Sequence, residues 1–193
     1  GGLYLEGSTV EGEVLVVGSG HVEIVGNASL GGVVLDATGT GDSLVSTVLL
    51  NDVVGTIDLR STSDSSYHVG YVYGNVAAGI EVYTVPGLIY EDSYLYAEID
   101  SNEVVGGGSE GIRVQSGGFG GIHPFIGHTE LDITRNVISG AGTGIYALLP
   151  EGTSYEAGDL LLRSSGNVIT GCGTGMDLGK ASGFGVELAA DSI

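Results

Sequence analysis

The chain is poor in basic residues, and this shortage excludes one large class of partners. Its 193 residues hold five lysines and arginines against 24 aspartates and glutamates, a formal net charge of −19. Phosphate binding needs clustered Lys and Arg, so a nucleic acid is excluded as a partner. The basic residues are Arg60, Arg113, Arg135, Arg163 and Lys180.

This excess of carboxylates points to a particular environment. Carboxylates at such a density suit a medium of high salt, where their repulsion is screened, or a surface that binds divalent cations. We therefore expect a salt-adapted, halophilic protein located outside the cell or on the cell surface.

Cysteines and long apolar runs are also scarce. Cys172 is the single cysteine, so no disulfide forms within the chain, and its Gly-rich surroundings predict a small core residue. No apolar run reaches the length of a membrane-spanning helix, so we expect no transmembrane segment. The chain opens with Gly-Gly and no initiator Met, which predicts a processed or excised segment that has lost any signal peptide.

Helix-forming patterns are missing as well. The chain contains 37 glycines, scattered along its whole length. No window of about a dozen residues holds apolar residues at the 3.6-residue period of a helix. The predicted fold class is therefore all-β.

What the chain does contain is a repeat marked by asparagine. Six asparagines recur with separations of 24, 24, 27, 34 and 31 residues. The segments NVISGAGTGI and NVITGCGTGM, from the last two of them, are identical at seven of ten positions. Such a repeat predicts a solenoid whose later turns carry insertions. The repeated residues are Asn27, Asn51, Asn75, Asn102, Asn136 and Asn167.

Short alternating stretches surround each asparagine. A Gly-rich corner follows the asparagine and leads into a strand such as Ile57-Asp58-Leu59 or Ile80-Glu81-Val82, with its outer positions apolar. Another alternating stretch precedes the asparagine. A period of two is typical of a strand with one buried face. Three short strands per turn, with Gly or Asn at the corners, predict a parallel β-helix.

On these asparagines and strands, residues 20–180 resemble the right-handed parallel β-helix proteins of the pectate-lyase-like superfamily. In that family an internal asparagine ladder marks a tight turn, and the resemblance implies that these six asparagines bond one another between adjacent turns. Asn tolerates the left-handed backbone that the turn needs, and stacked amides satisfy one another away from water. We expect a single domain over residues 1–193 with about seven turns.

Three insertions lengthen the later turns, at residues 84–93, 116–128 and 150–159. Loops on a rigid solenoid are where recognition usually occurs. We expect these loops either to form an interaction surface or to fold back over the sheet. Their candidate interaction residues are Tyr90, Phe119, His123, Phe125, His128 and Tyr155.

The resemblance also directs attention to one stripe of outward residues, because many members of the superfamily cleave or epimerise acidic polysaccharides. A pectate-lyase mechanism uses acidic residues that hold Ca²⁺ beside an arginine base. The resemblance thus implies Asp58, Glu81, Glu110 and Arg113 as candidate catalytic or saccharide-binding residues. The alternative is that these residues form a charged, solvated face without catalytic or saccharide-binding function. The paired carboxylates of polygalacturonase-like members are missing, since Ala78, Glu110, Thr143 and Thr174 occupy the corresponding positions.

A second candidate metal site lies in the segment DATGTGD. Asp36 and Asp42 are its candidate Ca²⁺ ligands, although the segment lacks a full set of oxygen ligands. Ca²⁺ is thus a candidate ligand, and no cofactor is required by the sequence.

The two ends of the chain read as strands, LYLEG and GVELAADSI, without a capping segment. Uncapped strand edges associate, so we expect either a piece of a longer β-helix or association between copies. The first hypothesis is a non-enzymatic, extracellular structural protein that self-associates into a surface layer, sheath or filament. The alternative is a carbohydrate-active β-helix, lyase-like or hydrolase-like, or a saccharide-binding module, with a polysaccharide as its partner.

Overall fold

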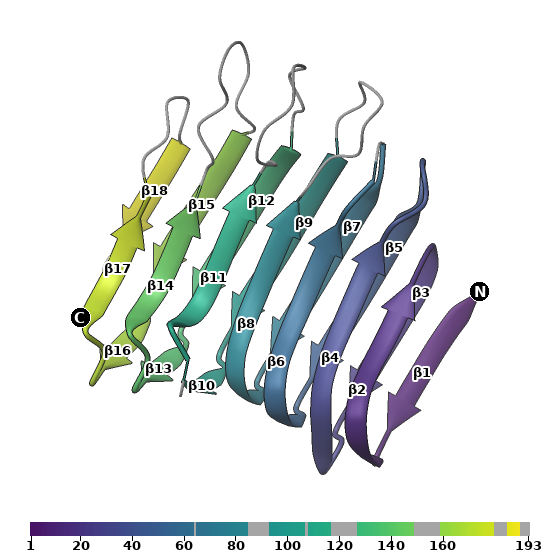
Figure 1. Cartoon of the computed structure of the whole chain (residues 1–193), viewed down its shortest axis with the longest axis horizontal. Coiled ribbons are helices and arrows are strands. Elements are labelled where there is room, and N and C mark those ends of the chain that lie inside the picture. Colours follow the sequence, from purple (N-terminus) through teal and green to yellow (C-terminus); the bar gives the residue numbers. More distant parts are fainter. Residues whose placement is uncertain are drawn as a thin grey trace.

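The described part of the chain consists of strands and turns. A computed structural model describes residues 1–63, 65–84, 93–106, 108–116, 127–148, 159–179 and 185–189. These ranges contain no helix, as the scattered glycines predicted. In Figure 1 the strands follow one another across the molecule from the N-terminal to the C-terminal end.

Eight parallel strands form the first sheet, sheet A. Each pairs with the strand from the next repeat, so strands far apart in the sequence lie side by side. The order is β1 (Gly2–Glu6), β3 (Gly20–Val25), β5 (Ser43–Leu49), β7 (Tyr67–Tyr73), β9 (Ser93–Asp100), β12 (Gly127–Thr134), β15 (Asp159–Ser165) and β18 (Gly185–Ala189).

The second sheet, sheet B, is also parallel and divides at β8. It begins with four long strands, β2 (Thr9–Val17), β4 (Ser29–Ala37), β6 (Asp52–Ser61) and β8 (Val76–Thr84). Beyond β8 each repeat has two strands. One branch is β10 (Glu103–Val105), β13 (Val137–Ser139) and β16 (Val168–Thr170), and the other is β11 (Glu110–Ser116), β14 (Thr143–Leu148) and β17 (Thr174–Leu178).

This division corrects the prediction of three short strands in every repeat. In the long strands the predicted corner is only a shift in register inside one strand, as between Val53 and Thr56. The bend falls on glycine because neighbouring backbones come too close for a side chain: a Cβ on Gly55 would lie 2.3 Å from the carbonyl oxygen of Gly31. In later repeats the corner is longer, so the two strands separate.

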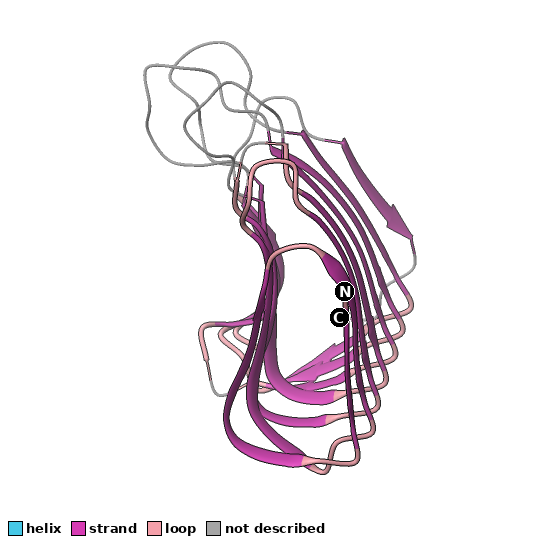
Figure 2. Cartoon of the chain, turned by 90° about the vertical axis from the view of Figure 1, so that its right-hand side faces the viewer, coloured by secondary structure: helices cyan, strands magenta, loops and turns pink. Residues whose placement is uncertain are grey.

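The core lies between the two sheets. Viewed along the stack, the sheets face one another and the repeats superpose (Figure 2). Every second side chain of β5 and β7 is buried, so alternation in the sequence becomes an inner and an outer face. Valine, leucine, isoleucine and alanine fill the interior in one continuous cluster. Two facing parallel sheets of this kind are compatible with the predicted β-helix.

The six repeated asparagines form a continuous column of hydrogen bonds. Each Nδ2 of the first five donates to the Oδ1 of the asparagine in the next repeat, at 2.7 to 3.0 Å. The same Oδ1 also accepts the backbone N–H of the preceding asparagine in the column. All six side chains are at most 2% exposed. Ser8 extends the column into the first repeat, where its backbone N–H donates to Asn27.

The left-handed residue of each turn is not the asparagine, contrary to the prediction. A positive φ, between 55° and 66°, falls on the residue immediately before each of the six asparagines and before Ser8. Four of these residues are glycines, but three are Leu50, Ser101 and Arg135. The asparagine supplies the hydrogen bonds, and its predecessor supplies the backbone bend. These residues are Gly7, Gly26, Leu50, Gly74, Ser101, Arg135 and Gly166.

The titratable side chain of His68 is buried in the core. His68 is 0% exposed, and its ring nitrogens lie 2.8 Å from the Ser46 hydroxyl and 2.8 Å from the Arg60 carbonyl oxygen. Burial lowers the pKa of His68 to about 4. The core therefore holds this imidazole in its neutral form.

Cys172 lies in the turn between β16 and β17. Its side chain is partly buried and packs against the core cluster. Its sulfur points toward the Thr170 carbonyl oxygen, at 3.6 Å.

A substitution at Leu50 tests whether the residue before the asparagine provides the left-handed bend of the turn. Leu50 has a φ of 56° and is 61% exposed, so Leu50→Gly relieves strain while losing little packing. We expect it to raise the free energy of unfolding by about 0.5–1 kcal/mol. Gly26→Ala, at the equivalent position with nothing near its Cβ, should lower it by about 1 kcal/mol. Urea denaturation measures both, and changes of the same sign would contradict the assignment.

Acidification tests the buried histidine. The folded-state pKa of His68 is depressed, so its contribution is present above pH 6.5 and is lost as the pH falls toward 4. The loss corresponds to about 3 kcal/mol at most. We expect denaturant unfolding of His68→Gln to show a weaker pH dependence than the wild type between pH 7 and pH 4, with its structural cost set by the difference at pH 8. Parallel pH profiles would contradict this.

Candidate functional site

Tyrosine is concentrated on two neighbouring strands. The chain has ten tyrosines, and five of them lie on β7 and β9: Tyr67, Tyr71, Tyr73, Tyr94 and Tyr96. Their spacing of two or four residues puts those of one strand on the same side of the sheet, and all five lie at the exposed or half-buried positions of their strands. We call these five residues and His128, which pairs with Tyr94 in the sheet register, the tyrosine face.

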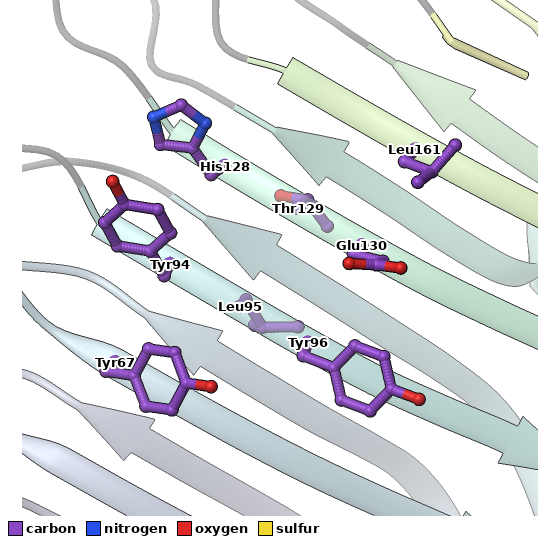
Figure 3. A pocket seen from close by; sticks show the side chains of 8 residues that line it. All are labelled: Tyr67, Tyr94, Leu95, Tyr96, His128, Thr129, Glu130 and Leu161. Atoms are coloured by element: carbon purple, nitrogen blue, oxygen red, sulfur yellow. The ribbon is translucent and has the colours of Figure 1, made fainter.

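At one end of the tyrosine face the aromatic rings form a groove. The Tyr94 and His128 rings stack at 4.6 Å between centroids and 10° between planes, and the Tyr67 ring lies 6.5 Å from that of Tyr94. Figure 3 shows these rings and Tyr96 standing over three adjacent strands. The groove has a volume of about 390 Å³, and its lining residues are Tyr67, Tyr94, Leu95, Tyr96, His128, Thr129, Glu130 and Leu161.

His128 was predicted to lie in an inserted loop. The structure places it in β12 instead, on the outer face of sheet A. Its stacking on Tyr94 makes it part of a regular surface. The other predicted loop residues, Tyr90, Phe119, His123, Phe125 and Tyr155, lie outside the described residues.

An acidic depression continues from the groove along the same strands. It has a volume of about 650 Å³ and is lined by Leu49, Tyr73, Glu98, Asp100, Asp132, Thr134 and Arg135. Glu98 accepts hydrogen bonds from two hydroxyls, those of Tyr73 and Tyr96. Burial and the Glu98 carboxylate raise the pKa of Tyr73 and Tyr96. Both phenols therefore keep their protons and hold Glu98 in place.

Two arginines pair with carboxylates in this depression and in the neighbouring groove. Arg135 donates to both oxygens of Asp100, and this contact lowers the pKa of that carboxyl. Arg163 lies 2.7 Å from Glu130 and 3.1 Å from Asp132. The carboxylates are thus held in fixed positions over β9 and β12.

The residues predicted for catalysis lie on the outer side of sheet B. The register aligns Asp58 with Glu81 and Glu81 with Arg113 in three adjacent strands. Glu110 lies three residues before Arg113, at the start of β11, and accepts a hydrogen bond from Ser109. The structure thus brings three of the four candidates into one row.

In this row the Asp58 carboxylate is buried, and both Asp58 and Arg113 have a polar atom without a hydrogen-bond partner among the described residues. Asp58 is 5% exposed, and its Oδ2 accepts from Arg60. The Arg113 guanidinium lies over the Tyr83 ring, 5.6 Å from its centroid. Among the described side chains, Asp58 Oδ1 and Arg113 Nε are buried without a hydrogen-bond partner. A shallow groove of about 290 Å³ lies beside the row, lined by Arg60, Thr62, Glu81 and Tyr83.

The predicted Ca²⁺ ligands have protein partners. Asp36 is 9% exposed and accepts from the Thr62 hydroxyl, and burial raises the pKa of its carboxyl. Asp42 accepts from the Ser19 hydroxyl and from the Gly39 backbone N–H. In the described ranges there is no group of three or more His, Cys, Asp or Glu side chains that could hold a metal ion.

Comparison with protein-family models, with curated proteins and with solved structures finds no match to this chain. The resemblance to the pectate-lyase-like superfamily therefore stays a prediction. Over the part of the chain that the structure describes, no helix is long and apolar enough to cross a membrane.

Sequence reasoning missed the tyrosine face. The signal was present in YHVGYVY and SYLYAEID, the segments that precede Asn75 and Asn102. The alternation in these segments predicts strands, but it gives each tyrosine only an outward position and does not show that the rings meet.

Proposed function

We propose that this chain is a right-handed parallel β-helix of about seven turns, located outside the cell, that binds a saccharide on its tyrosine face without cleaving it. The observation that carries this proposal is the stacked pair of Tyr94 and His128, which lines a groove together with Tyr67 and Tyr96.

The chemistry of a sugar ring matches that surface. A sugar presents apolar C–H groups on its two faces and hydroxyl groups around its edge. Aromatic rings offer flat apolar area with little loss of conformational entropy, and carboxylates accept hydrogen bonds from hydroxyls. Tyr94, Tyr96 and Glu130 supply both kinds of contact in one groove. Apolar grooves with a few fixed polar groups are typical ligand sites.

The burial and the hydrogen bonds of two carboxylates, Asp58 and Glu98, favour saccharide binding over saccharide cleavage. Acid–base catalysis needs groups that reach the substrate and exchange protons with it. Asp58 is 5% exposed and paired with Arg60, and Glu98 is held by two tyrosine hydroxyls. These contacts support a surface that positions a ligand.

Self-association into a layer or filament, the first function predicted from the sequence, stays a prediction. The tyrosine face has a defined groove with fixed polar partners, which self-association does not require. The geometry therefore supports the predicted alternative, a saccharide-binding module, better.

Truncation of one ring tests the proposal. We expect the chain to retain oligosaccharides on a glycan array, and Tyr94→Ala to weaken binding of the best ligand by about tenfold in calorimetry, because one stacking surface is lost. Tyr146→Ala is the matched control, since Tyr146 is a half-buried tyrosine in β14 of sheet B. An array without any bound glycan, or equal losses in the two variants, would contradict the proposal.

A further inference from the structure

The aromatic groove and the acidic depression lie end to end on the same strands, and we call the two together the trough. Both lie over β9 and β12, and both have a β7 tyrosine at one side, Tyr67 in the groove and Tyr73 in the depression. Tyr96 joins them, because it lines the groove while its hydroxyl bonds Glu98 in the depression. From Tyr94 to Asp100 the trough extends roughly 20 Å, about the length of four linked sugar rings.

The two halves of the trough offer different contacts. In the first half Tyr94 and His128 stack on each other, so this pair offers its outer ring faces and its edges beside the tilted Tyr67 ring. The second half offers carboxylate oxygens. A ligand that fits both halves must present an apolar face at one end and hydrogen-bond donors at the other.

The donors and acceptors in the acidic half show which hydrogen-bonding groups a ligand must supply. Five donor side chains there already donate to carboxylates: Tyr73, Tyr96, Thr134, Arg135 and Arg163. Each carboxylate oxygen has two lone pairs, so acceptor capacity is left over. A complementary ligand group therefore donates hydrogen bonds.

The charges of the trough also favour a ligand that donates hydrogen bonds. Glu98, Asp100, Glu130 and Asp132 face two guanidinium groups, those of Arg135 and Arg163. The excess of two negative charges lies on a protein of net charge −19. A uronate would be repelled here, while an ammonium group would be attracted and brings three donors.

We infer that the ligand of the tyrosine face is a linear oligosaccharide that carries free amino groups. This inference rests on the proposed saccharide binding and gives its ligand class. Sugar rings pack against the outer faces and edges of the stacked Tyr94 and His128 rings, and the ammonium groups of the following rings bind between Glu98 and Asp132.

Three tetrasaccharides of matched length test the inference by calorimetry on the full chain. They are the tetramers of glucosamine, of N-acetylglucosamine and of galacturonic acid, which are cationic, neutral and anionic. At low ionic strength we expect the glucosamine tetramer to bind about tenfold more tightly than the neutral one, and the galacturonic acid tetramer to bind weakest. At about 1 M NaCl, where the screening length is ~3 Å, the advantage of the amine should disappear.

Isosteric variants assign the effect to the trough. Asp132→Asn should reduce the preference for the amine over the neutral tetramer by about threefold or more. Glu81→Gln, which removes the same charge from sheet B, should keep the preference. Circular dichroism checks that both variants fold.

The possible outcomes separate the inference from the proposed function. If the neutral or the uronate tetramer binds as tightly as the amine through Tyr94, the inference fails and saccharide binding stands. If the preference for the amine survives Asp132→Asn and is lost in Glu81→Gln, the site is not the trough and the inference also fails. If none of the three tetramers binds and the glycan array is empty, both fail.

Discussion

A single column of buried amide hydrogen bonds fixes the arrangement of the whole protein. Ladder asparagines such as Asn51 donate two hydrogen bonds to the side-chain oxygen of the asparagine in the next repeat, one from Nδ2 and one from their own backbone N–H. The buried Nδ2 groups also donate to backbone carbonyl oxygens, as Asn51 does to Ile24, so a shift of one residue would break several buried hydrogen bonds at once. The column therefore holds every repeat at the same position, and a period of two then determines which side chains point outward.

The outer faces of the two sheets follow from this constraint and differ in character. Because Tyr67 aligns with Tyr94, and Tyr94 with His128, the aromatic rings of three distant segments meet on sheet A. On sheet B the register places Asp58, Glu81 and Arg113 in one row across three strands. There the Asp58 carboxylate is buried and accepts a hydrogen bond from Arg60. The outer side of sheet A thus has an open aromatic groove, and that of sheet B has a charged row in which the Asp58 carboxylate is buried.

Much of the fold could be predicted from the sequence, because the ladder and the alternation are local patterns repeated at readable intervals. The all-β class, the alignment of the six asparagines and the row of Asp58, Glu81 and Arg113 were all readable in this way. The position of the left-handed residue was not, since Leu50 and Arg135 give no sign of an unusual backbone. The continuous strands before β9 were also missed, because a bulge at Gly55 and a corner at Gly106 look alike in sequence.

The candidate site was less predictable than the fold for a physical reason. A groove is made by side chains from neighbouring repeats, and even members on adjacent strands lie far apart in sequence: Tyr94 and His128 are separated by 34 residues. Their meeting depends on the register and on insertions of different length between β8 and β12. Without the register, each tyrosine reads as an isolated outward residue.

The most direct test of this account is a crystal structure of the chain bound to the oligosaccharide that it binds most tightly. The account predicts a sugar ring stacked on Tyr94 and His128, with the following rings over Glu98 and Asp132. Sugar bound along the Asp58 and Arg113 row of sheet B, with the tyrosine face empty, would contradict it.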